Sequence, residues 1–181
     1  AIEHNFTPLY ADIFSGYKQT LPVNFKNFLC SFNGSAHQSR ILLTSLLKKN
    51  KWFNPEYCSQ LFTVNNSVID GAICSLTGDN ERYYRKFFVN DDVEESTASS
   101  FDYKSMDHSH NIRVIAPKLS ESFVHLVSET MATSYCPMIT EKSLYSIVTK
   151  SLFVTYGQPG WHRSLEVNFG FKLYTKIFDY T

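Results

Sequence analysis

The stretch from Phe123 to Gly160 constrains the fold most, because a strand-like run in it is followed by a helix pattern. Residues 123–127 form an apolar run of the length and composition of a buried strand. Thr140 has a side chain that commonly caps helices, and apolar residues recur after it at the spacing of one helical face, from Leu144 to Val148. The sequence therefore predicts a strand–loop–helix unit here.

A second unit of the same kind lies upstream. Residues 27–32 are a short apolar run, residues 33–36 have turn composition, and Arg40 begins an amphipathic pattern that ends in several lysines. Residues 57–64 and 151–156 also read as strands, whereas 79–89 and 161–167 read as helices. Strand and helix patterns thus alternate, which predicts an α/β fold with a parallel sheet flanked by helices.

The rest of the chain has less pattern. Residues 1–26 are expected to be an irregular N-terminal segment, and residues 27–181 to form the α/β domain. Within it, the acidic, serine-rich residues 90–100 are expected to be a mobile loop. His108 and His110 have a spacing that chelates metals, but an exposed loop is the preferred interpretation, and no metal site is assigned. Residues 111–116 fit either a short strand or the beginning of a helix that 118–122 continues.

Charge and hydropathy exclude several classes of partner. Lys plus Arg and Asp plus Glu both number 17, so no net charge draws the chain to nucleic acid. No run approaches the roughly 20 apolar residues of a membrane span, and the N-terminus lacks a signal-peptide pattern. Cys30 and Cys58 lie in apolar or aromatic runs typical of buried free thiols. We therefore expect a cytoplasmic protein without bound nucleic acid, and the aromatic clusters leave a homo-oligomer open.

The candidate site lies at the two helix starts. Glu141 and Lys142 fall in a first helical turn near the carboxyl end of a strand, where ligands bind in open parallel sheets. Lys142 suits a phosphate, because its charge adds to free backbone N–H groups and to the helix dipole, and Glu141 suits ribose hydroxyls. Arg40 has the matching position in the upstream unit. The alternative for all three is an ordinary solvated first turn with surface salt bridges.

The two units together resemble the donor-binding segment of the alpha-1,3-fucosyltransferases. That family has a strand ending in F-E-N-S, a T-E-K helix start and a later strand ending near glycine and proline. The counterparts here are residues 128–130, 140–142 and 157–160, and the upstream run with Asn33 and Arg40 also matches. The chain is similar as well to glycosyltransferase-like proteins of viruses and marine microbes, which share a V-S/T-E-T strand end and an I-T-E-K helix start.

The resemblance implies the Rossmann-like, C-terminal half of a two-domain glycosyltransferase that binds a nucleoside-diphosphate sugar, with GDP-sugars among the candidates. Arg40 and Lys142 would then hold the diphosphate, and Glu141 the ribose, without a metal or other cofactor. Asn33 and Thr140 become possible donor-site residues. Glu129 would either meet the donor sugar or orient the site through backbone N–H groups. The catalytic base and the acceptor stay unassigned.

Two departures from the family pattern bear on function. Ile139 stands where the family has tyrosine, which puts the donor's identity in doubt, and residues 1–26 cannot supply the acceptor domain. The chain is thus expected to be a fragment or a minimal version, and the alternative function is a non-catalytic nucleotide- or carbohydrate-binding module. His37 is either a phosphate contact or a solvent-exposed loop residue. Trp161, after the turn at 157–160, is a candidate sugar platform.

Overall fold

The computed structural model describes residues 24–62, 70, 108–130 and 139–179. The described elements follow one another as strands β1 (Asn27–Asn33), β2 (Cys58–Gln60), β3 (Ser122–Ser128) and β4 (Phe153–Tyr156) with helices α2 (Gln38–Lys49), α5 (His108–Glu121), α6 (Glu141–Val148) and α7 (Trp161–Phe169). The predicted strands at 27–32 and 123–127 and the predicted helices that follow them are confirmed.

The four strands form one parallel sheet with the order β2-β1-β3-β4. The two central strands are β1 and β3, with Leu29 opposite Val124 and Cys30 opposite His125. The chain leaves β1 toward β2 on one side and leaves β3 toward β4 on the other. This arrangement confirms the predicted α/β class and is Rossmann-like, with a reversal of direction between β1 and β3.

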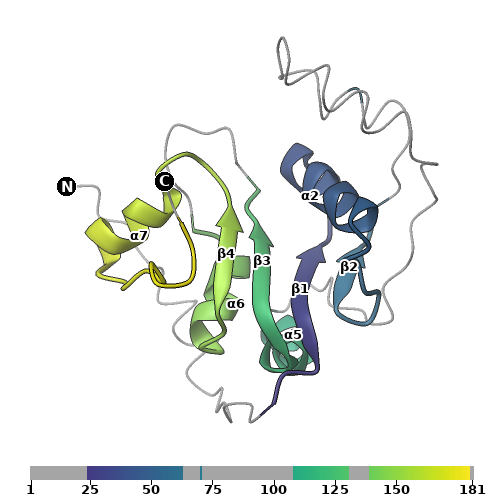
Figure 1. Cartoon of the computed structure of the whole chain (residues 1–181), viewed down its shortest axis with the longest axis horizontal. Coiled ribbons are helices and arrows are strands. Elements are labelled where there is room, and N and C mark those ends of the chain that lie inside the picture. Colours follow the sequence, from purple (N-terminus) through teal and green to yellow (C-terminus); the bar gives the residue numbers. More distant parts are fainter. Residues whose placement is uncertain (1–23, 63–69, 71–107, 131–138, 180–181) are drawn as a thin grey trace.

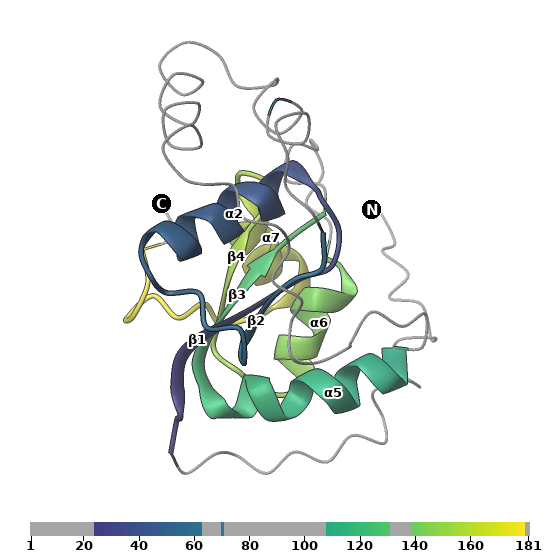
Figure 2. The same cartoon turned by 90° about the vertical axis from the view of Figure 1, so that its right-hand side faces the viewer.

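Helices cover both faces of the sheet, which gives three layers (Figures 1 and 2). Successive residues of a strand point to opposite faces, so Leu29 and Cys30 mark the two sides. Leu29 packs in one cluster with Leu47 of α2. Cys30 packs in another with Ile115 and Leu119 of α5. The helix that follows β1 and the helices α5 and α6 therefore lie on opposite faces of the sheet.

The segment after residue 107 differs from the sequence interpretation. His108 and His110 begin helix α5 instead of lying in an exposed loop, and residues 111–116 are helical rather than a strand. The reason is the apolar face formed by Ile112, Ile115, Ala116 and Leu119, all of which are buried against β1 and its neighbours. The helix predicted at 79–89 and the loop predicted at 90–100 lie outside the described residues.

Cys30 and Cys58 are buried and free, as predicted. Burial raises the pKa of the Cys58 thiol to about 11 and that of Cys30 still further. Both thiols are therefore neutral at physiological pH and serve as small apolar core groups.

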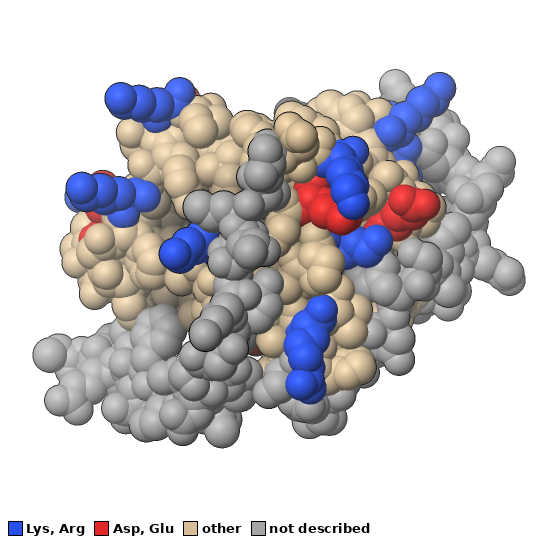
Figure 3. Space-filling model, turned by 90° about the horizontal axis from the view of Figure 1, so that it is seen from below, with Lys and Arg blue, Asp and Glu red and all other residues tan. Residues whose placement is uncertain are grey.

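The amino-terminal edge of the sheet carries mixed charge. Viewed from that edge, the described basic side chains stand apart from one another and acidic side chains lie beside some of them (Figure 3). Lys26 and Glu121 form an ion pair there at 2.5 Å.

Among the described residues, no helix combines the length and apolarity that crossing a membrane requires.

Candidate functional site

The candidate site lies at the carboxyl edge of the sheet, between β1 and β3. Because the chain turns to opposite sides after these neighbouring strands, α2 and α6 begin at the same edge but on opposite faces. Such a reversal leaves a crevice outside the strand ends, and ligands of open α/β sheets bind there. Arg40 and Lys142 stand in the first turns of the two helices that border it.

Arg40 joins the start of α2 to the end of β3. Its side chain is 3% exposed, and its guanidinium donates a hydrogen bond of 2.7 Å to Thr130 Oγ1. The neighbouring Ser39 hydroxyl donates to the backbone carbonyl of Glu129 at 3.0 Å. The cation predicted for a surface salt bridge or a phosphate thus lies inward, over the end of the central strand.

Glu129 is fully buried at the end of β3. Its carboxylate accepts hydrogen bonds from the Thr140 hydroxyl at 2.5 Å, from the Ser143 hydroxyl at 2.6 Å and from the Thr140 backbone N–H at 3.3 Å. A buried carboxylate requires such partners, because desolvation of an unpaired charge costs several kcal/mol. Of the two roles left open for Glu129, this geometry is that of an orienting residue.

The side chain of Glu129 therefore already occupies a place at the N-terminus of α6. Thr140 caps the helix, and its hydroxyl also accepts from the Lys142 backbone N–H at 3.4 Å. The Glu129 carboxylate accepts from the Thr140 N–H, so an incoming phosphate would find that donor already engaged. By contrast, the first turn of α2 contains no acidic residue, and its N-cap, His37, makes no capping hydrogen bond through its side chain.

Lys142 and Glu141 form an ion pair with each other. Their side chains are 14% and 28% exposed, so the pair is partly screened from solvent. Burial raises the pKa of Glu141, but the Lys142 ammonium and its hydrogen bond outweigh that effect and hold the pKa below its ordinary value. The lowered pKa keeps Glu141 ionised at neutral pH, and a ligand phosphate must compete with it for Lys142.

His37 lies within electrostatic range of both cations, Arg40 and Lys142. Its pKa is lowered by burial and then by the positive charges of Arg40 and Lys142. Both helix starts contact Glu129 at the end of β3, α2 through Ser39 and α6 through Thr140, so they lie at the same edge of the sheet. With its pKa lowered, the His37 imidazole is neutral at physiological pH and can accept a hydrogen bond.

No family model, curated protein or solved structure matches this chain.

Asn33 is the last residue of β1, at the carboxyl edge of the sheet. It is fully buried, and its side-chain amide donates to Ser31 Oγ at 3.1 Å. Its backbone N–H donates to Ser59 Oγ at 2.9 Å, whereas the side-chain oxygen has no hydrogen-bond partner within the described part of the chain. The hydrogen bonds of Asn33 therefore join the end of β1 to β2.

Trp161 does not provide a sugar platform. It is 1% exposed and packs against Phe153 and Leu165 in the core between β4 and α7. The prediction failed because the glycines at 157 and 160 let the chain fold back, so that the ring lies under the turn and the Gly157 backbone lies against it.

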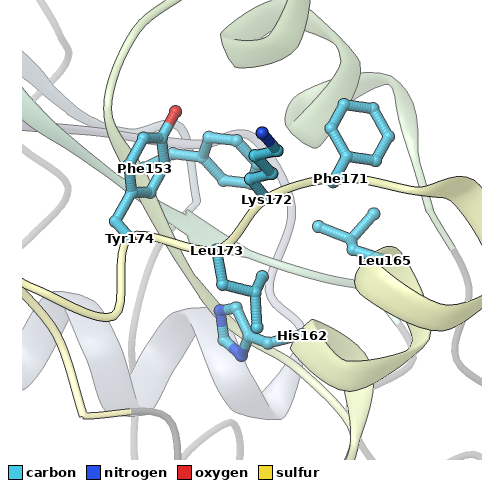
Figure 4. A pocket seen from close by; sticks show the side chains of 7 residues that line it. All are labelled: Phe153, His162, Leu165, Phe171, Lys172, Leu173 and Tyr174. Carbon is cyan, nitrogen blue, oxygen red and sulfur yellow. The ribbon is translucent and has the colours of Figure 1, made fainter.

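A small cavity beside α7 is a poor alternative site. It has a volume of about 30 Å³ and is lined mainly by aromatic and apolar side chains, including Phe153, Phe171 and Tyr174 (Figure 4). That is room for about one water molecule and not for a sugar or a nucleotide. His162 in its wall accepts a hydrogen bond from the Thr155 backbone N–H at 3.2 Å, and burial lowers its pKa.

The sequence interpretation missed Ser39, Thr130 and Ser143, which hold Glu129 and Arg40 in place. A signal was available, because a carboxylate at the end of a buried strand must find hydroxyl or N–H partners nearby. In the described segments, no cluster of three or more His, Cys, Asp or Glu side chains is arranged to hold a metal ion.

Proposed function

We propose that the crevice binds the diphosphate of a nucleoside-diphosphate sugar, and that the chain is the donor-binding part of a fucosyltransferase-like glycosyltransferase. The observation that carries the proposal is that Arg40 and Lys142 stand in the first turns of two helices from separate strand–helix units, and that both helix starts contact Glu129 at one edge of the sheet. A diphosphate has two charged groups, and two cations at the reversal point of an open α/β sheet suit it.

The chemistry of glycosyl transfer fits such a pair. Negative charge grows on the nucleoside diphosphate as the bond to the sugar breaks. Cations already in place at that point stabilise the transition state more than the ground state. When a phosphate binds Lys142 in place of Glu141, the Glu141 carboxylate can accept hydrogen bonds from ribose hydroxyls.

A binding module without transferase activity is the second candidate. One observation favours it: of the carboxylates that the structure describes near the two helix starts, Glu129 is buried with three donors and Glu141 is paired with Lys142, so neither is placed as a base. In a transferase of this kind, another domain would supply the catalytic base and the binding site for the acceptor.

Calorimetric titration with nucleoside diphosphates and their sugars tests both candidates. We expect saturable binding below millimolar concentration, and absence of binding throughout the panel would refute both. Donor turnover with candidate acceptors then separates them: turnover supports the transferase, and binding without turnover supports the module.

A further inference from the structure

Glu129 connects three elements at the crevice. Its backbone N–H donates to the Tyr156 carbonyl of β4 at 3.0 Å, and its carbonyl accepts from the Ser39 hydroxyl of α2 at 3.0 Å. Its carboxylate receives the donors of Thr140 and Ser143 at the start of α6. One residue therefore fastens both helix starts that carry the two cations.

We propose that Glu129 is the positioning residue of the crevice, which fixes the start of α2 relative to the start of α6 and thereby sets the span between Arg40 and Lys142. Its relevance to ligand binding rests on the function proposed above. The carboxylate itself is too buried and too fully occupied to contact a ligand.

The contacts explain why this role falls to a glutamate. Thr140 and Ser143 present an N–H and two hydroxyls, and a carboxylate is the side chain that accepts from all of them. A carboxylate beside the first turn of α6 also interacts favourably with the positive end of the helix dipole. Glutamine keeps the size but loses the charge, whereas alanine leaves all three donors without this acceptor.

The test compares ligands that span different distances. GDP carries two phosphates and GMP one, so only GDP needs both cations at a fixed separation. In Glu129→Ala, we expect the ratio of GDP to GMP affinity to fall about tenfold or more relative to the wild type, with a smaller fall in Glu129→Gln. Leu119→Ala is the control, because Leu119 is a buried core residue of α5 with no side chain in the crevice.

Backbone hydrogen exchange provides a second measurement that needs no ligand. We expect faster exchange in Glu129→Ala than in Leu119→Ala at the first turn of α6, residues 140–144, because the carboxylate holds that turn, whereas Ser39 of α2 contacts the backbone carbonyl that alanine keeps. Glu129→Gln serves the same comparison if the alanine variant does not fold.

The outcomes separate the two proposals. If the wild type binds neither nucleotide, the proposed function fails, while selective exchange at the start of α6 still supports the positioning role. If the wild type prefers GDP and Glu129→Ala and Glu129→Gln keep that preference, the positioning role is overturned. Exchange no faster than in Leu119→Ala at the start of α6 overturns it as well.

Discussion

At the scale of single residues, His37 reports on the geometry of the crevice. Because Arg40 and Lys142 both lower its pKa, replacing either cation with alanine should raise that pKa. An NMR titration of the imidazole in Arg40→Ala and Lys142→Ala measures the change without any ligand. Lys26→Ala is the control, since Lys26 lies at the other edge of the sheet and pairs with Glu121. An unchanged pKa in Lys142→Ala would mean that α6 does not face His37.

His125 makes stability depend on pH. Burial lowers its pKa to about 3, and its ring nitrogen Nδ1 lies 2.5 Å from Ser146 Oγ. Above its ordinary value of 6.5 the histidine is neutral in both states, so it adds no pH dependence. As the pH falls from 6.5 toward 3, only the unfolded chain binds the proton, and stability should fall by about 1.4 kcal/mol per pH unit from this group.

Urea unfolding of the wild type and His125→Gln at pH 7, 6 and 5 checks that expectation. The free energy of unfolding of the wild type should fall more steeply with acidification than that of the variant. Parallel slopes would show that His125 is protonated in the folded protein, contrary to its complete burial against Phe32 and α6.

At the scale of elements, the start of α6 depends on the Thr140 hydroxyl. Thr140→Ala removes the cap and the hydrogen bond to the Glu129 carboxylate. We expect a loss of about 2 kcal/mol in the free energy of unfolding, because a cap contributes about 1 kcal/mol and a hydrogen bond to a charged group somewhat more. Thr140→Ser keeps the hydroxyl and is the matched control. Equal stability of the two variants would contradict the assigned role of the hydroxyl.

The sequence predicted some elements better than others for physical reasons. The starts of α2 and α6 could be predicted from the sequence because each helix follows an apolar strand and has a clear apolar face. For helix α5 the sequence left a strand and a helix open over residues 111–116, since Pro117 lies inside the helix and its first turn is polar. The spacing of Ile112, Ile115, Ala116 and Leu119 was the available signal, and burial of that face outweighs the backbone hydrogen bond lost at the proline.

At the scale of the whole molecule, topology brings distant segments of the sequence together. Arg40 and Thr130 are 90 positions apart, yet they are hydrogen-bonded because β1 and β3 are neighbours. The sequence could predict two helix starts with cations, but it could not predict the strand order that makes them face one crevice. Nor could it predict that Glu129 would occupy the terminus of α6, since that depends on the approach of β3 to α6.

The central claim is that Arg40 and Lys142 hold one diphosphate together. Calorimetric titration of GDP into the wild type, Arg40→Ala, Lys142→Ala and the double variant tests it most directly. We predict that each single substitution weakens binding about tenfold or more, because each removes a hydrogen bond to a charged phosphate, and that the double variant does not bind measurably. Equal affinity of all four proteins for GDP, or no binding by a folded wild type, would contradict the claim.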